Sequence, residues 1–374
     1  MFFKDVIGQE DIKERLIRFV QEQRLSHALL FTGPSGTGKL ALAIAFARYV
    51  SCRNKGENDS CGKCPSCRKY NKLAHPDLHF VFPVFKTKEI RKPISDDFIH
   101  RWREFVLKSP YFTLSHWLGY LENENAQGLI YEKESDSVIK KMSLKPFESE
   151  YKVMIIWLPE KMHDACSNKL LKVIEEPPEK TLFLMVTEDE EGIISTIRSR
   201  CQIIKVPYID NESMKKELAS MEGTSSEDIP NIVHLAGGDY LKVLDYLNPD
   251  EDNRFFFTSF QEMMRYAYKP NIMKLMEWAE EMAVIGRDRQ KAYFAFALRL
   301  IREYFVMNLK RPDLVYLNDE EFNWGKKFSP FINERNIIPF AREFEDGIKH
   351  ISMNGNPRII FLDTALRIAK LVRR

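Results

Sequence analysis

The sequence lacks the features that mark membrane proteins, secreted proteins and strongly basic nucleic-acid-binding chains. No apolar run approaches the roughly 20 residues that a transmembrane helix needs. The start, MFFKDVIGQE, contains Asp5 and Glu10 and no apolar segment behind a basic head, so we expect no signal peptide and a cytoplasmic protein. Lys and Arg number 56 against 54 Asp and Glu, and a net charge of +2 gives no general attraction to DNA or to a membrane. Any DNA contact would have to be local or shared with partner chains.

The chain also contains no internal repeat and no low-complexity segment. Its 374 residues are 29% charged and 44% apolar, which is typical of a soluble globular protein with two or three domains. Short apolar runs alternate with helical patterns up to residue 208, and this alternation predicts an α/β domain with a five-stranded parallel sheet covered on both faces. The expected strands are 27–32, 79–85, 152–157, 181–186 and 202–206.

Helical patterns account for most of the remaining chain. No strand pattern recurs after Pro207, and helices are expected at 211–223, as a pair within 229–247, and as longer amphipathic helices from 253 onward. We therefore expect an α/β domain at 1–208, a small helical lid at 209–250 and an all-α domain at 251–374.

Two further features of the α/β domain are a long insertion and a helix with a clear end. An insertion at about 86–151 is rich in aromatic and charged residues, with an amphipathic helical pattern at 98–112 and a loop pattern at 121–128. The sequence does not indicate what this insertion contacts. A helical pattern at 162–176 ends before two consecutive prolines, which cannot continue a helix.

Four of the six cysteines lie within residues 52–67, in a C-x8-C-x2-C-x2-C pattern. Two overlapping C-x2-C pairs, with a fourth thiol reached by a turn, are typical of a tetrahedral four-cysteine zinc site. Because four thiolates leave no position open for water, such a metal would be structural. A redox disulfide pair and an iron–sulfur cluster are the alternatives, and the polar neighbouring residues favour zinc. The expected ligands are Cys52, Cys61, Cys64 and Cys67.

A glycine-rich segment, 33-GPSGTGKL-40, follows the first expected strand and precedes a helical pattern. This is the context of a phosphate-binding loop, in which backbone N–H groups surround a triphosphate and a lysine reaches its β and γ phosphates. Lys39 has the lysine position, but Leu40 replaces the Ser or Thr whose hydroxyl holds Mg²⁺. We therefore expect at most weak binding of ATP or ADP. The loop residues are Gly33, Pro34, Ser35, Gly36, Thr37, Gly38, Lys39 and Leu40.

A working ATPase also needs acids at the end of a neighbouring strand, one to hold Mg²⁺ and one to polarise water. The candidate strand, 153-VMII-156, is followed by Trp157, Leu158 and Pro159, and Glu160 comes only afterwards. The sequence therefore predicts no ATPase activity of the chain's own.

Several segments together resemble the clamp-loader subunits of bacterial DNA polymerase III, which belong to the AAA+ superfamily of P-loop NTPases. The resemblance covers residues 1 to about 208 in detail and the helical remainder only in length and pattern. The segments that carry it are 6-VIGQE-10, 27-HALLFTGPSGTGK-39, the four-cysteine segment, 75-HPD-77, 168-NKLLKVIEEPPEKT-181 and 199-SRC-201.

This resemblance implies a part in DNA replication. It implies a hetero-oligomer with motor and delta subunits, held by a C-terminal helical collar at 251–374, that loads the sliding clamp on primed DNA within the polymerase (nucleotidyltransferase) holoenzyme. In the motor subunits an Asp-Glu pair stands where this chain has Trp157 and Leu158, and a lid arginine aligns with Leu241, next to Lys242. These losses are similar to those of the stator group, the delta-prime subunits.

The resemblance implies a catalytic role for one charged residue, Arg200. Arg200, in Ser199-Arg200-Cys201, aligns with the arginine finger that the family presents to ATP held by a neighbouring subunit. Alternatively, Arg198 and Arg200 are solvated loop charges. Two other functions also remain open: a motor ATPase of the same loader, and a module in which the cysteine knuckle and the aromatic insertion grip single-stranded nucleic acid.

Overall fold

The computed structural model divides into two compact units, Met1–Leu244 and Asp245–Arg374. It describes residues 1–374 except 123–125, 222–228, 248–250, 270, 310–313 and 374. The expected boundary near 250, the end of the expected helix 211–223 and part of the expected loop 121–128 lie outside the described residues. The division into three parts at 208 and 250 therefore stays a prediction.

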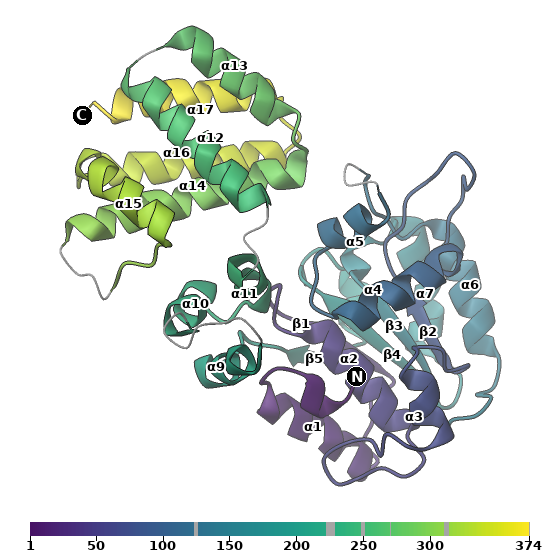
Figure 1. Ribbon diagram of the computed structural model, residues 1–374. Coiled ribbons are helices and arrows are strands. Elements are labelled where there is room, and N and C mark those ends of the chain that lie inside the picture. The colour runs from purple at the N-terminus through teal and green to yellow at the C-terminus, as the bar shows by residue number, and fades with distance from the viewer. Residues whose placement is uncertain (123–125, 222–228, 248–250, 270, 310–313, 374) are drawn as a thin grey trace. The chain divides into compact units, whose positions relative to one another are not determined.

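A parallel sheet forms the centre of the first unit, with the strand order β2-β3-β4-β1-β5 (Figure 1). All four neighbouring pairs are parallel, and in this register Leu30 of β1 lies between Met185 of β4 and Ile203 of β5. The predicted five-stranded parallel sheet is thereby confirmed. The strands are β1 Ala28–Thr32, β2 Leu78–Val81, β3 Lys152–Trp157, β4 Thr181–Thr187 and β5 Gln202–Lys205.

Strand β2 ends four residues earlier than the apolar run 79–85 predicted. Pro83 cannot donate to a neighbouring strand, and a proline inside a sheet ends its ladder of hydrogen bonds. The N–H of Phe82 donates instead to the hydroxyl of Ser95, at 3.0 Å, so the chain leaves the sheet toward the insertion.

The helices up to α11 surround the sheet and extend beyond it, and α11 itself continues past Leu244, where the first unit ends. Residues that stop a helix set where some of these helices end. For example, α7 ends at Glu175 because Pro177 and Pro178, which cannot continue a helix, come next but one. The helices are η1 Phe3–Asp5, α1 Glu10–Gln21, α2 Lys39–Ser51, α3 Pro65–Tyr70, η2 Ser95–Phe98, α4 Ile99–Lys108, α5 Leu114–Tyr120, α6 Glu132–Ser143, η3 Pro159–Lys161, α7 Asp164–Glu175, α8 Ser195–Arg198, α9 Asn211–Ser220, α10 Ile229–Ala236 and α11 Tyr240–Leu247.

Both faces of the sheet are covered by helices, as Figure 1 shows. Helix α2 contacts β1, β3 and β4 on one face. On the other face, side chains of α6, α7 and α8 form a buried cluster with the strands. Leu30, Met154 and Met185 belong to this cluster, and their neighbours in sequence point to the α2 face because strand residues alternate.

The insertion builds an aromatic cluster at the carboxyl ends of β2 and β3. The indole ring of Trp102, on α4, stacks on Phe82 at 4.1 Å and meets Trp117 of α5 edge-on at 5.1 Å. Trp157, the last residue of β3, lies 5.3 Å from Trp102 and 5.0 Å from Phe112, measured between ring centroids. The insertion therefore completes the core of the first unit at this edge of the sheet.

The second unit is helical throughout its described residues. Its core is rich in aromatic rings, among them Phe294 and Phe361, which stack at 4.5 Å. No helix in the described parts of the chain is long and apolar enough to cross a membrane. The helices are α12 Glu251–Tyr268, α13 Ile272–Ala283, α14 Arg287–Asn308, α15 Asp319–Phe328, η5 Ser329–Phe331, α16 Ile337–Ser352 and α17 Pro357–Leu371.

Candidate functional site

The glycine-rich segment connects the carboxyl end of β1 to the first turn of α2, which is the placement of a phosphate-binding loop. Gly33 allows this connection to pass beside the segment after β5, because a Cβ there would lie 2.1 Å from the carbonyl oxygen of Val206. Gly36 has a φ of +72°, in the left-handed region that favours glycine. The backbone therefore has the path that the sequence predicted for 33–40.

Residues at the start of α11 contact this loop. The N–H of Tyr240 donates to the carbonyl oxygen of Gly36 at 3.1 Å. The carboxylate of Asp239 lies so close that a Cβ on Gly36 would be 1.7 Å from its Oδ1. Because an anionic phosphate and a carboxylate repel each other, Asp239 at this place opposes nucleotide binding.

Tyr111, from the insertion, contacts the loop at its other end. Its hydroxyl accepts a hydrogen bond from the N–H of Ile7 at 3.0 Å, and its ring lies 4.8 Å from the ring of Tyr240. A Cβ on Gly38 would lie 3.0 Å from that hydroxyl oxygen. Burial raises the pKa of the Tyr111 phenol well above its usual value, so the group stays neutral. The ring thus lies between the N-terminal segment, the loop and α11.

Lys39 is buried, and its ammonium donates to the carbonyl oxygen of Pro34 within the same loop. Burial lowers the pKa of Lys39, whereas the charges of Glu188, Glu160 and Asp239 act in the opposite direction. The lysine is therefore held by its own loop in this structure.

The positions expected to carry the magnesium and water ligands are apolar and buried. Trp157 and Leu158 are each only 3% exposed, and Leu40 is 4% exposed. The ring of Trp157 belongs to the aromatic cluster of the insertion, whereas Leu158 has a left-handed φ of 57°. None of these side chains offers an oxygen to a metal ion.

Glu160, the acid that follows the strand three residues later than Trp157, lies at the same edge of the sheet. Its carboxylate accepts hydrogen bonds from the Thr187 hydroxyl at 2.8 Å and from the N–H of Glu188 at 3.0 Å, at the end of β4. Burial raises the pKa of Glu160 above its usual value. Both carboxylate oxygens accept hydrogen bonds, so this acid ties the η3 segment to the end of β4.

Arg200 lies on the loop between α8 and β5, at the edge of the first unit. Its Nη2 forms an ion pair with Oε1 of Glu175, at 2.8 Å, and its Nη1 donates to the carbonyl oxygen of Thr196, also at 2.8 Å. Arg198 pairs separately with Glu191 at 2.7 Å. The guanidinium of Arg200 is about one-third exposed, with a side-chain exposure of 31%.

The four expected ligand cysteines come together in space. Their sulfur atoms all lie within 4.8 Å of one another, and Cys52 and Cys64 are 4.0 Å apart. Four thiolates about 2.3 Å from one zinc ion lie about 3.8 Å from each other, so small shifts would give a tetrahedral site. Backbone N–H groups of Cys61, Cys64 and Cys67 point at the sulfurs of the preceding cysteines, at 3.3–3.4 Å, and such donors stabilise thiolates. The donor set fits a structural metal ion.

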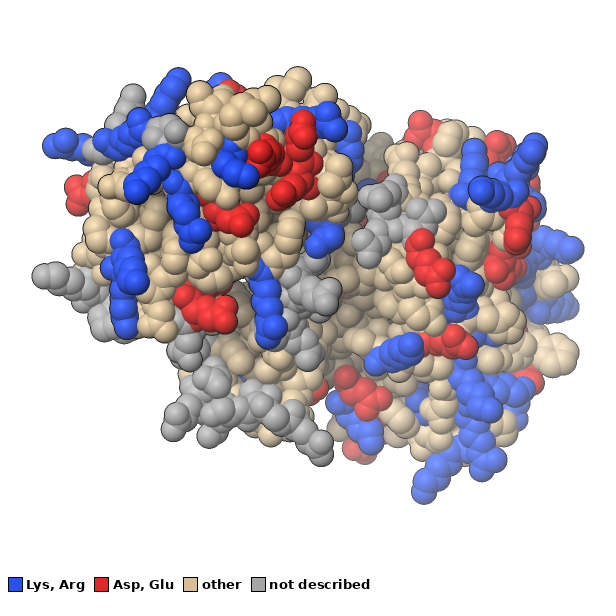
Figure 2. Space-filling view, turned by 45° about the horizontal axis from the view of Figure 1, so that its top comes forward, with Lys and Arg blue, Asp and Glu red and all other residues tan. Residues whose placement is uncertain are grey.

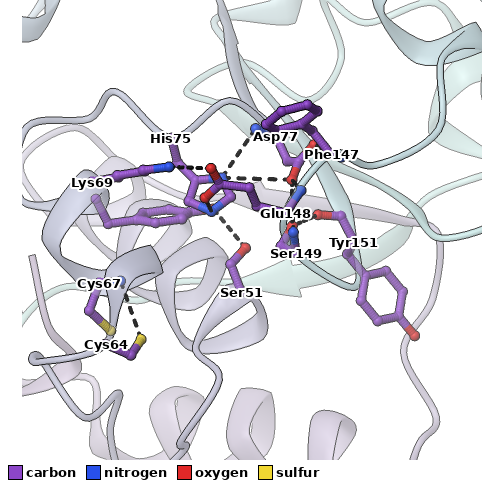
Figure 3. A network of polar contacts seen from close by, with 11 residues as sticks. Ser51, Cys64, Cys67, Lys69, His75, Asp77, Phe147, Glu148, Ser149 and Tyr151 are labelled. Atoms are coloured by element: carbon purple, nitrogen blue, oxygen red, sulfur yellow. Dashed lines mark hydrogen bonds and ion pairs between the residues drawn. The ribbon is translucent and has the colours of Figure 1, made fainter.

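A buried polar network joins the cysteine module to the sheet, as Figure 3 shows. Lys69, on helix α3 after the last two ligand cysteines, pairs with Glu148. The carboxylate of Asp77 accepts from the N–H groups of Phe147, Glu148 and Ser149, at 2.6, 2.8 and 2.9 Å. Burial alone would raise the pKa of Asp77, but these donors lower it below its usual value. The segment 147–149 therefore anchors both α3 and the start of β2.

The structure brings the four cysteines together, and it places two residues at the loop that the sequence analysis missed. Tyr111 and Asp239 reach the loop region from segments far away in the chain, and no spacing in the sequence points to them. Leu241, the second residue of α11, is buried, whereas the next residue, Lys242, is exposed.

A family model described as DNA polymerase III, delta subunit, matches residues 8–210, more than half of the 374 residues. The chain therefore belongs to this family of DNA polymerase III subunits, the clamp-loader subunits of AAA+ type that the sequence motifs indicated.

Individual proteins are similar to this chain. A DNA polymerase III subunit delta' of Bacillus subtilis (strain 168) is 24% identical over 273 residues, which cover 68% of this chain and 70% of the relative. A tau/gamma subunit of Haemophilus influenzae is 28% identical over 237 residues, 63% of this chain but only 28% of the relative's length. A DNA polymerase III gamma subunit-related protein of Thermotoga maritima has a TM-score of 0.40 at 12% identity, with coverage of 96% of this chain and 99% of that one.

Proposed function

We propose that this chain is a delta-prime-type stator subunit of a DNA polymerase III clamp loader. It has no ATPase activity of its own, and it takes part in DNA replication by helping to load a sliding clamp on primed DNA. Such a subunit works in the cytoplasm as part of a hetero-oligomer with motor and delta subunits. The observation that carries the proposal is the burial of Trp157 and Leu158 where the motor subunits have their acids.

The contacts made by residues 33–40 support a nucleotide site that no longer binds ATP or ADP tightly. Lys39 is turned back onto Pro34, and Tyr240 is bonded to Gly36. Nucleotide would have to displace these groups and also tolerate the carboxylate of Asp239. ATP or ADP therefore binds weakly at most.

Zn²⁺ is the metal we propose for the cysteine cluster, with Cys52, Cys61, Cys64 and Cys67 as its ligands. When bound, it would cross-link residues 52–67 and supply no catalysis, because four thiolates complete its coordination. Helix α3 supplies Cys67 and carries Lys69 on the same turn, so the module would hold the 147–149 segment through Glu148.

Arg200 is the residue of this chain that we propose to take part in ATP hydrolysis, in the site of a neighbouring subunit. Its guanidinium is always charged, is partly exposed and lies on a loop at the edge of the unit. A neighbouring subunit that docked on this edge could place the γ-phosphate of its own ATP against Arg200, which would then stabilise the charge of the transition state.

The two alternative functions have less support. A motor ATPase would need metal and water ligands that the side chains at 40, 157 and 158 do not provide. A module for single-stranded nucleic acid needs a basic groove with exposed aromatic rings. The face drawn in Figure 2 shows Lys and Arg interspersed with Asp and Glu, and Trp102, Trp117 and Trp157 are buried.

The proposal is tested by assembly. The purified chain should be mixed with candidate DNA polymerase III motor and delta subunits, and the mass of the product measured. A complex containing this chain in a fixed stoichiometry is expected. If the chain stays alone in such mixtures, yet binds single-stranded DNA with a strong salt dependence, the nucleic-acid module replaces the stator.

A further inference from the structure

Two of the five N–H donors of Arg200 are engaged within its own chain. Nη2 pairs with Glu175 and Nη1 with the carbonyl oxygen of Thr196, both at 2.8 Å. Nε is buried and has no hydrogen-bond partner among the described residues. A guanidinium recognises a phosphate best through two parallel N–H donors, and here both terminal nitrogens already have acceptors.

We propose that Glu175 is a latch that restrains Arg200 until a neighbouring subunit docks. This inference rests on the proposed role of Arg200 in another chain's ATP site. Glu175 is the last residue of α7, and Pro177 and Pro178 follow it closely, so its position relative to the loop is fixed by the end of that helix. To place two parallel N–H donors on a phosphate, the guanidinium has to turn away from the Glu175 carboxylate, which holds Nη2. Glu175 is therefore a positioning residue and not a catalytic one.

The strength of the pair suits a latch that opens on docking. The two side chains are 31% and 53% exposed, so solvent weakens their attraction. Exposed ion pairs of this kind shift an equilibrium by at most about fivefold, and a triphosphate with several negative charges competes well against one carboxylate. The latch therefore lowers the engagement of Arg200 without preventing it.

The same region of the chain offers two matched controls. Glu191 pairs with Arg198 at 2.7 Å, so Glu191→Gln removes an equivalent ion pair two residues away from the finger. Glu176→Gln removes the same charge at the residue adjacent to Glu175. Neither carboxylate is paired with Arg200, whose carboxylate partner is Glu175.

The experiment rebuilds the complex from its partner subunits with wild-type chain or with one of four variants: Arg200→Ala, Glu175→Gln, Glu191→Gln and Glu176→Gln. ATP turnover stimulated by DNA and clamp is measured at low and at high salt, together with thermal unfolding of each chain alone. We expect Glu175→Gln to raise turnover by about two- to fivefold at the site that this chain faces, with the gain shrinking at high salt because salt screens the pair. The two control variants should match wild type, and unfolding should be unchanged.

Each other result has a distinct meaning. If Arg200→Ala lowers turnover but Glu175→Gln equals the controls, there is no latch, and the role of Arg200 in trans stands. If Glu175→Gln lowers turnover as Arg200→Ala does, Glu175 holds the finger in its working position, and a latch is contradicted. If Arg200→Ala has no effect, the trans role itself fails, and the latch fails with it.

Discussion

At the residue scale, Trp157 decides what the nucleotide site can do. Its indole ring stands at the end of β3, where a magnesium-binding carboxylate would be needed, and packs on Trp102 and Phe112. The same ring that removes the acid also completes the aromatic cluster of the insertion. In our proposal, the absence of a magnesium ligand and a contact of the core thus fall at one position.

We predict that the purified chain turns over no ATP, because no described side chain at 40, 157 or 158 can hold Mg²⁺ or orient water. The measurement is steady-state phosphate release by wild type and by Lys39→Ala, at high protein concentration. Both proteins should give the background rate. Hydrolysis that Lys39→Ala abolishes would contradict the stator interpretation.

Trp157 also gives a stability prediction. Trp157→Ala removes a large ring that is 3% exposed, and such truncations lower the free energy of unfolding by about 3–5 kcal/mol. Trp157→Phe keeps most of the contacts and should cost clearly less. Urea unfolding measures both, and equal stability of Trp157→Ala and wild type would show that this ring is not part of the core.

At the element scale, we expect the folded structure of the cysteine module to depend on a bound metal ion. We predict one zinc ion per chain, since residues 52–67 bury few apolar side chains besides the cysteines themselves. Zinc bound to such peptides contributes apparent free energies on the order of 10 kcal/mol. Metal analysis should give one equivalent for wild type and a large loss for Cys64→Ser. The control is Cys166→Ser, a substitution in α7 outside the cluster, and this variant should still contain one zinc ion per chain.

Asp77 holds the segment 147–149 that contacts this module. The three backbone N–H groups of that segment donate to its carboxylate and keep the pKa of Asp77 below the usual value. Asp77→Asn loses acceptor capacity, and we expect the free energy of unfolding at pH 7 to fall by about 2–3 kcal/mol. Because the folded pKa is lowered, the contribution of Asp77 is present above the unfolded pKa of about 3.9 and is lost as the pH falls through the folded value.

Urea unfolding of wild type and Asp77→Asn at pH 7 and near pH 3 checks this sign. The gap between the two proteins should narrow in acid. A constant gap would mean that the substitution acts through packing and not through the charge of Asp77.

At the scale of the whole molecule, the sequence predicted the sheet well and the contacts around the loop poorly. All five strands were found because buried parallel strands read as short apolar runs, and four cysteines in one segment are a local signal. Tyr111 and Asp239 were missed because tertiary folding brings them to the loop from separate segments, and only the place of Glu160 after the expected strand was evident. The left-handed turn at Leu158, which carries Glu160 toward β4, has no sequence signal either.

The central claim is that this chain contributes to ATP hydrolysis only through Arg200, in a neighbour's site. The most direct test compares ATP turnover and clamp loading by complexes rebuilt with wild-type chain or with Arg200→Ala. Arg200 is partly exposed on a loop outside the buried core, so the variant should fold, keep its zinc and assemble. We predict that turnover falls only in part, because one site among several is affected, and that clamp loading falls with it. Equal turnover and equal loading by the two complexes would show that Arg200 is a surface charge and would contradict the account.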